Sequence, residues 1–334
     1  ELAALEDDRD PGYALISTAI NRPAGKLITM VINRFGPGFA AKNDAYKLQT
    51  KNRLQRAIAR NDLGGLYAMA EITRYIAWLH AFMPELLDDA LMSRLSANNS
   101  EAEALRSILV GMAPHVNQDL RAKLKSAIFA GVRQHRAGNG TFENAASRIV
   151  GYVRDDLSRA PDDPDRLRPG EAKRLLSEAH EQLRADAVDV MADWLKGEKG
   201  RPAHQLWREV YSKMFEVLWP AGRQHQSDRA SIPLAKLALA AGEAFPEAWS
   251  AVRPYVLSLN EDWPTFYFLA NEDAQPVIDR YPQVVLDMLW TLLKPATRGQ
   301  SHELEKILER LANAEPALRR DRRYQMLETR VMRL

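Results

Sequence analysis

The sequence has 334 residues, of which 46% are hydrophobic and 27% are charged, a composition typical of a folded chain and unlike that of disordered proteins. It contains no cysteine, which excludes disulfides, thiolate metal sites and cysteine nucleophiles and fits a reducing, cytoplasmic location. The formal net charge of +2 gives the chain as a whole no strong attraction for nucleic acid. The sequence also shows neither a long apolar run nor a signal-peptide pattern, so it predicts no membrane span and no secretion.

The first half of the sequence shows helical periodicity interrupted by proline and glycine. We expect helices over residues 13–21, 23–35, 63–82, 117–132 and 141–153. Leu48, Leu54 and Ile58 mark one face of a further helix, and Pro84 begins another. Ser100 and Glu103 have the spacing of a capping box, in which each side chain satisfies a free backbone donor of the other.

The second half follows a segment rich in proline and charge. We take residues 161–170 as a linker between an N-terminal half, 1–160, and a C-terminal half, 171–334. Beyond it we expect helices over residues 171–196, 202–219, 227–242, 246–257, 276–280, 282–293, 302–312 and 319–334.

These patterns predict an all-α protein of about fifteen helices, since no segment alternates apolar and polar residues as a half-buried strand would. Amphipathic helices joined by short turns can bury their apolar faces by stacking in pairs. Proline recurs at the helix starts, and the tetratricopeptide and ankyrin signatures are missing, which favours irregular HEAT-like helical repeats, an α-solenoid. A compact multi-helix domain is the alternative arrangement.

The residues that carry catalysis or bind metals are not arranged in any of the usual motifs. None of the seven histidines forms HExxH or has another histidine three or four residues away. Gly138-Asn139-Gly140 has neither the preceding strand nor the following Lys-Ser/Thr of a phosphate-binding loop, and no GxSxG is present. We therefore predict no catalytic, cofactor-binding or metal-binding residues, no cofactor and no enzymatic activity.

Aromatic and basic side chains offer two candidate binding sites. Trp263, Phe266 and Tyr267 lie in a short aromatic segment that we predict to be exposed and to bind a protein partner. Near the C-terminus, four arginines lie roughly on one side of an expected helix and form the alternative, a nucleic-acid-binding module: Arg319, Arg322, Arg323 and Arg330.

The first third of the chain contains three short motifs: Asn21-Arg22-Pro23-Ala24-Gly25-Lys26-Leu27, Phe82-Met83-Pro84-Glu85 and Glu101-Ala102-Glu103-Ala104-Leu105. They resemble motifs of a known family, the large C-terminal helical regions of bacterial anti-phage defence proteins, often fused to sirtuin-like NADase domains. Later proline-marked helix starts are similar to the family's as well, at Trp219-Pro220, Phe245-Pro246 and Tyr281-Pro282.

The resemblance implies a sensor or scaffold region that recognises a phage or partner protein and controls an attached effector. The sequence begins at Glu1, without an initiator methionine and inside an expected helix, so we expect the chain to be part of a longer protein. Any effector activity would belong to a segment upstream. The sequence leaves the identity of the partner and the oligomeric state open.

Overall fold

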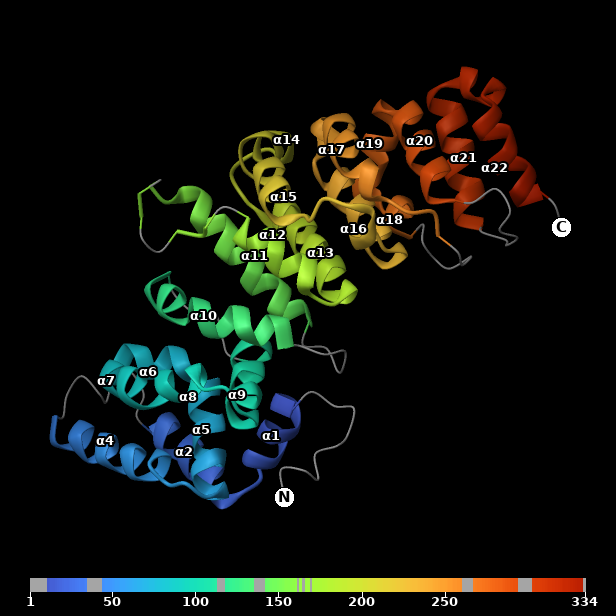
Figure 1. Ribbon diagram of the computed structural model, residues 1–334. Helices are drawn as coiled ribbons and strands as arrows, with labels where there is room; N and C mark the ends of the chain where they lie inside the picture. The colour runs from blue at the N-terminus through green and yellow to red at the C-terminus, as the bar shows by residue number, and fades with distance from the viewer. Residues whose placement is uncertain are drawn as a thin grey trace. The chain divides into compact units, whose positions relative to one another are not determined.

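Figure 1 shows the computed structural model of the chain. The structure describes residues 11–34, 44–112, 118–134, 142–160, 162–163, 166–168, 170–259, 267–293 and 302–332. Throughout these residues the regular secondary structure is helical, and the β-type pairing described there is one isolated parallel bridge between Leu259 and Leu293. The all-α prediction is therefore confirmed. No helix within these ranges has the length and apolar composition needed to cross a bilayer.

The chain divides into two compact units. Unit 1 comprises Glu1–Arg148, Ala160–Arg166 and Glu178–His180, and unit 2 comprises Ile149–Arg159, Leu167–Ser177 and Glu181–Leu334. The chain thus passes between the units more than once between residues 148 and 181, instead of crossing at one linker. The expected linker includes Leu167, which is buried and whose backbone N–H donates to Asp156 Oδ1 at 2.5 Å within unit 2.

Unit 1 is organised around helix α5. Its helices are α1 (Pro11–Ala19), α2 (Pro23–Arg34), α4 (Asp44–Ile58), α5 (Leu63–Arg74), α6 (Ile76–Phe82), α7 (Pro84–Leu86), α8 (Met92–Ser96), α9 (Ser100–Gly111) and α10 (Gln118–Gln134). Helix α5 packs against α1, α2, α4 and α9, and it contributes Leu66, Met69 and Ile72 to the core. The backbones of α1 and α9 approach closely at Gly12, where a Cβ atom would lie 2.7 Å from Ser107 Cβ.

Unit 2 stacks its helices largely in chain order, as Figure 1 shows for α16 to α22. Its helices are α12 (Glu171–Glu178, the last residue of which belongs to unit 1), α13 (Glu181–Gly197), α14 (Ala203–Leu206), α15 (Ser212–Leu218), α16 (Asp228–Ala240), α17 (Phe245–Val252), α18 (Tyr267–Ala270), α19 (Gln275–Arg280), α20 (Pro282–Leu292), α21 (His302–Ala314) and α22 (Arg322–Met332). Helix α11 (Phe142–Ser158) begins in unit 1 and continues into unit 2. In unit 2, α16 packs on α13 and α17, and α20 packs on α17, α21 and α22, which is the local pattern of a helical-repeat array.

Several expected helix boundaries are wrong. The helix expected over 63–82 is two helices separated at Tyr75, and that expected over 171–196 is broken at Ala179 and His180. The N-cap of α9 is Asn99, whose side chain accepts a hydrogen bond from the Ala102 backbone N–H at 2.8 Å, and not Ser100. The Gly-Asn-Gly turn at 138–140 lies outside the described residues.

Two π-helical turns interrupt helical runs, at Leu87–Leu91 in unit 1 and Trp207–Tyr211 in unit 2. The second begins at Trp207 and ends at Tyr211, and Phe215 follows four residues later in α15, so the three aromatic residues recur every four positions. All three side chains are buried, with exposed fractions of 2%, 0% and 5%. These aromatic residues are therefore part of the core of unit 2.

Candidate protein-binding groove in unit 1

The two sites expected from the sequence are only partly covered by the described residues. Trp263 and Phe266 lie outside them, and Tyr267 begins α18 with its side chain outside them as well. Arg319 belongs to a 3-10 turn, Pro316–Arg320, that ends before α22 begins, so the expected single helix over 319–334 is wrong.

The C-terminal arginines differ in what they contact. Arg319 and Arg322 are exposed, and the side chain of Arg330 lies outside the described residues. Arg323 donates through Nη2 to Asp321 Oδ2 at 2.8 Å and through Nη1 to Asp287 Oδ1 at 3.3 Å. Because these carboxylates already balance its charge, Arg323 has less to offer a phosphate than an unpaired arginine would.

Exposed apolar side chains are concentrated in unit 1 instead. Of the eight large hydrophobic residues that are exposed among the described residues, six lie between positions 13 and 63: Tyr13, Ile20, Leu27, Met30, Leu48 and Leu63. Leu27, Leu48 and Met30 expose 55%, 59% and 66% of their surface. Leu48 was expected on the same face as Leu54 and Ile58, but only the latter two are buried. A contiguous exposed apolar patch marks a binding surface more often than isolated exposed residues do.

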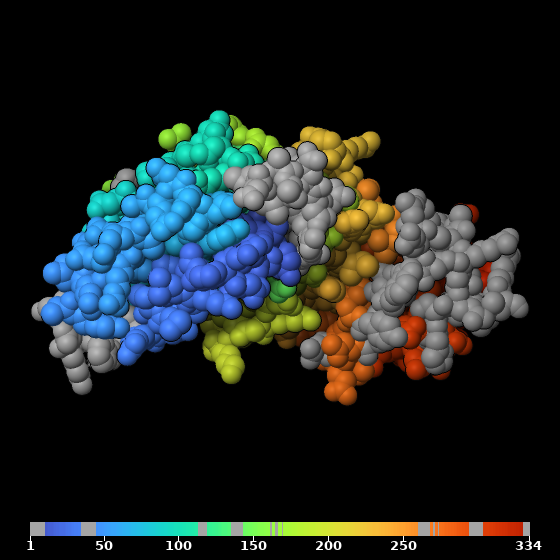
Figure 2. Space-filling view, turned by 90° about the horizontal axis from the view of Figure 1, so that it is seen from below, coloured from blue at the N-terminus to red at the C-terminus, as the bar shows by residue number. Residues whose placement is uncertain are grey.

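A groove lies between helices α2 and α4. Both helices rest on α5 and barely contact each other, which leaves the gap between them open. The groove has a volume of about 700 Å³. Leu27, Ile28 and Val31 of α2 and Leu54 and Ala57 of α4 provide its apolar lining. Figure 2 shows the α2 and α4 segments, in the darker and lighter blues of the bar, on the face of the molecule in view.

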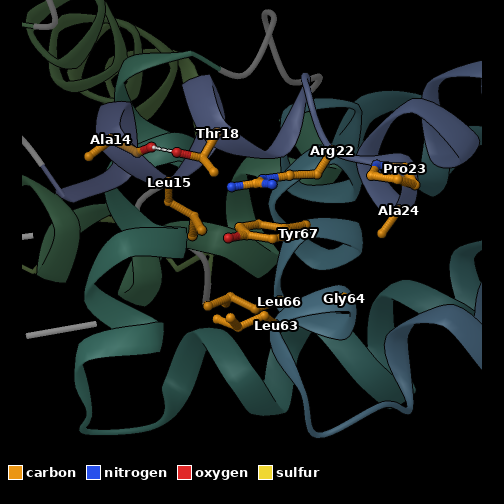
Figure 3. A pocket seen from close by; sticks show the side chains of 10 residues that line it. All are labelled: Ala14, Leu15, Thr18, Arg22, Pro23, Ala24, Leu63, Gly64, Leu66 and Tyr67. Atoms are coloured by element: carbon orange, nitrogen blue, oxygen red, sulfur yellow. Dashed lines mark hydrogen bonds between the residues drawn. The ribbon is translucent and has the colours of Figure 1, made fainter. Parts of the chain in front are cut away.

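A second hollow adjoins the groove and is drawn in Figure 3. It has a volume of about 580 Å³ and is lined by Leu15 and Thr18 of α1, Arg22 before α2, and Tyr67 of α5, among others. Pro23, Ala24 and Gly64 line both hollows, so the two meet at the start of α2. The apolar surface therefore continues from α1 across α2 to α4.

Two close backbone approaches fix the helices that form the groove. At Gly25 of α2, a Cβ atom would lie 2.0 Å from the carbonyl oxygen of Ala19, and at Gly65 of α5 it would lie 2.1 Å from that of Arg60. Only glycine fits without a backbone shift at either position. Asp62 caps α5 by accepting from the Gly65 N–H at 3.0 Å, and its ion pair with Arg60 and this hydrogen bond lower its pKa.

The groove has a basic rim. Residues 22–62 contain nine lysines and arginines against two aspartates, a net charge of +7 in a chain whose total is +2. Arg53, Arg56 and Arg60 line the groove itself. Arg60 pairs with Asp62, and Arg56 Nε donates to the Asn52 carbonyl at 3.2 Å.

The other cations around the groove differ in whether a carboxylate pairs with them. Lys51 pairs with Glu85 at 2.8 Å. Arg22, Lys26 and Arg53 have no ion pair with any residue that the structure describes. Their positive charge is therefore available to a ligand at the groove and the adjoining hollow.

A buried carboxylate lies beneath α2. Glu71 of α5 is fully buried, and its Cγ lies 3.3 Å from the position that a Gly25 Cβ would occupy. Its Oε2 accepts from Arg74 Nε at 3.1 Å. Burial raises the pKa of Glu71, and the attraction of Arg74 opposes this rise.

Sequence reasoning pointed away from this surface although two signals for it were readable. The motif at residues 21–27 supplies Arg22, Pro23, Ala24 and Leu27 to the two hollows, but it was interpreted as a family marker only. The charge imbalance of residues 22–62 is visible in the sequence, whereas the predicted basic site was the set of arginines near the C-terminus.

The described residues contain no group of three or more histidines and carboxylates placed to hold a metal ion.

The chain is similar in sequence to a protein of unknown function from a bacterium. The chain is 31% identical over 278 residues, 82% of its length, to the uncharacterized protein y4cA of Sinorhizobium fredii (strain NBRC 101917 / NGR234). The chain covers 23% of that protein's length. No protein-family model matches the chain. No solved structure matches it either.

Proposed function

We propose that this chain is a non-catalytic protein-binding region of a longer protein and that it binds its partner through the groove of unit 1. The observation that carries the proposal is the apolar surface from α1 to α4, which the described residues leave uncovered beside cations that have no ion pair among those residues. Apolar anchors set in a hollow with a polar rim are the usual features of a protein-binding site.

The proposal extends to the setting in which the region works. The short motifs at residues 21–27, 82–85 and 101–105 resemble those of anti-phage defence proteins, and this resemblance supports a sensor or scaffold role that controls an attached effector. The absence of cysteine supports a cytoplasmic location. A partner that prefers one arrangement of the region would shift the effector's equilibrium by that difference in affinity and no more.

Site-specific crosslinking in cells of the source organism tests the binding role. A photoreactive phenylalanine derivative replaces Leu27 in one variant and Met326, an exposed residue of unit 2, in the other. We expect a protein to be crosslinked at position 27 and not at position 326. The crosslinked protein is then purified, and Leu27→Glu is expected to weaken its affinity for the chain by about tenfold or more, because a charge in the apolar lining is costly to bury.

Two results would count against the proposal, and each concerns a different part of it. If position 27 crosslinks no protein, or Leu27→Glu binds as tightly as Met326→Glu, the groove is not the binding surface. If the crosslinked partner is the same host protein with and without phage infection, the defence role fails while protein binding stands.

A further inference from the structure

We infer that the groove between α2 and α4 receives an acidic amphipathic helix of a partner protein. The inference rests on the proposed protein-binding function and names the kind of partner. Three features of the groove lead to it: its shape, the spacing of its apolar residues and its unbalanced positive charge.

The shape of the groove suits a helix. Its walls are two helices that both lie on α5 and scarcely touch each other, so a third helix can fill the space that their own packing leaves. Helix α4 has 15 residues and is therefore about 22 Å long. A helical occupant of three to four turns matches that length, and an amphipathic helix in an apolar groove is a common way of recognising a peptide.

The apolar lining sets the pattern of the occupant. Leu27 and Val31 of α2 are four residues apart and form a stripe along that helix. On α4, Leu54 lines the groove but is already buried at 1% exposure, and Ala57 is half-buried, so α2 supplies most of the accessible apolar surface. Leu27 exposes 55% of its surface in this state, which is apolar area that a partner would remove from water. The complementary surface is a helix with apolar residues at positions i, i+3 or i+4, and i+7.

The positive charge of the groove's rim predicts that the partner helix is negatively charged. Arg53 and Arg56 are three residues apart on α4, beside the apolar stripe, and Lys26 is exposed next to Leu27 on α2. Arg53 and Lys26 have no ion pair with the described residues, while Arg60 is already matched by Asp62. Glutamates and aspartates on the polar flanks of the occupant would complete these pairs, which favours an acidic helix over a basic one.

The same features of the groove disfavour two other classes of anionic ligand, nucleic acid and anionic membrane surfaces. Nucleic acid is bound mainly through phosphate contacts on polar, positively charged surfaces, and an apolar groove lining contributes nothing to those contacts. A membrane surface is bound by apolar side chains that project into it. The groove instead sets its apolar residues in a hollow of about 700 Å³.

A designed peptide tests the inference directly. The probe is a fluorescent helical peptide of about four turns with leucine at i, i+3, i+7 and i+10 and glutamate at most other positions. The 334-residue chain is titrated into it and the anisotropy is followed. We expect saturable binding that weakens as salt is raised, and binding about tenfold or more weaker for a scrambled peptide of the same composition and for one with lysine in place of glutamate.

Matched charge reversals place the binding in the groove. The variant with Arg53→Glu and Arg56→Glu is expected to lose about tenfold or more in affinity. A control with Arg319→Glu and Arg322→Glu in unit 2 makes the same change in total charge on exposed residues and is expected to bind like the unmodified chain. Circular dichroism and urea unfolding of both variants check that the fold is intact.

The inference is overturned if the scrambled peptide binds equally well or if the two charge reversals have the same effect. It is also overturned if a DNA duplex or phosphatidylserine vesicles bind at the groove and the peptide does not. These outcomes are distinct from failure of the proposed function. A groove that crosslinks a protein partner at position 27 but rejects every acidic helix would retain the protein-binding role and lose only its acidic specificity.

Discussion

The two units of this chain differ in how many of their surface cations pair with carboxylates. In unit 2 several surface arginines pair with carboxylates on nearby elements, as in Arg208–Glu247, Arg280–Glu243 and Arg310–Asp279. Each of these pairs joins residues 31 to 39 positions apart in the sequence, so it links neighbouring layers of the stack. In unit 1, α2 and α4 present cations without such partners beside exposed leucine and methionine.

The difference follows from how each unit packs its helices. Unit 2 packs helices that lie close in chain order, such as α16 on α13 and α17 and α21 on α19 and α20. Ion pairs join such layers, as Arg310 of α21 does with Asp279 of α19. Unit 1 instead places α1, α2, α4 and α9 around α5, and helices that share one central neighbour need not close against each other. The gap between α2 and α4 is the result. The proposed binding surface therefore lies in unit 1.

The largest loss of unfolding free energy is expected when a buried residue of α5, the central helix of unit 1, is truncated. Met69 of α5 is fully buried, and Met69→Ala would remove core contacts and leave a cavity, which costs about 2–5 kcal/mol of unfolding free energy. Met30→Ala removes the same atoms from a side chain that is 66% exposed and is expected to change stability by less than about 0.5 kcal/mol. Urea unfolding of both variants measures the contrast. Equal losses would mean that α5 is not the centre of the unit.

Glycine substitutions give a second contrast between the units. Gly25→Ala would place a Cβ 2.0 Å from the Ala19 carbonyl oxygen, so α1 and α2 would have to separate, at a cost of about 1–3 kcal/mol. Gly197 at the end of α13 has no atom within 4 Å of its Cβ position, so Gly197→Ala should be neutral or stabilise by up to about 1 kcal/mol. Thermal unfolding compares the two. A neutral Gly25→Ala would show that the close approach of α1 and α2 is not needed.

The sequence predicted most helices but not how they meet. Periodicity predicted a helix over 227–242, close to the observed α16, Asp228–Ala240, and the structure shows that Ser227 caps this helix by accepting from the Ala230 N–H at 3.3 Å. Periodicity missed the breaks at Tyr75 and at Ala179 and His180, because none of these is a glycine or proline. Helix breaks at such residues depend on tertiary packing, which local propensity does not record.

The groove was hidden for a related reason. Leu27 has the three- and four-residue spacing to apolar neighbours that core-facing positions have, so the sequence gives no sign that it is exposed. Its exposure results from the poor contact between α2 and α4, two helices separated by residues 35–43. The excess of lysine and arginine over residues 22–62 was the part of the site that the sequence did contain.

A polar network around Asp287 in unit 2 tests whether the carboxylates of this unit stabilise its packing. Asp287 of α20 accepts from the buried Trp249 Nε1 at 2.9 Å and pairs with Arg253 at 3.0 Å. Asp287→Ala leaves the indole N–H without its acceptor, which should cost about 1–3 kcal/mol. Asp189→Ala breaks the pair with Lys236, in which both side chains are 38% exposed, and should cost less than about 1 kcal/mol. Similar losses in urea unfolding would contradict a structural role for Asp287.

The smallest effect concerns the pH dependence of unit 1. Because burial raises the pKa of Glu71, the folded chain keeps this proton to a higher pH than the unfolded chain does. The folded state then binds more protons, so this group lowers the unfolding free energy as the pH rises above about 4.5, the ordinary value for the carboxyl. Glu71→Gln cannot ionise, so it removes this decrease in unfolding free energy. The variant should therefore become more stable relative to the unmodified chain as the pH is raised.

Glu85 provides a comparison of opposite sign in the same unit. Its hydrogen bond to Lys51 lowers its pKa, so its contribution is present above the unfolded value and is lost as the pH falls through the folded one. Glu85→Gln should therefore lose stability relative to the unmodified chain as the pH is raised, by a small amount because the pair is partly exposed. Urea midpoints at several pH values measure both differences. If the two variants follow the same trend, burial beneath α2 does not control the charge of Glu71, and the carboxyl must be stabilised in its ionised form there.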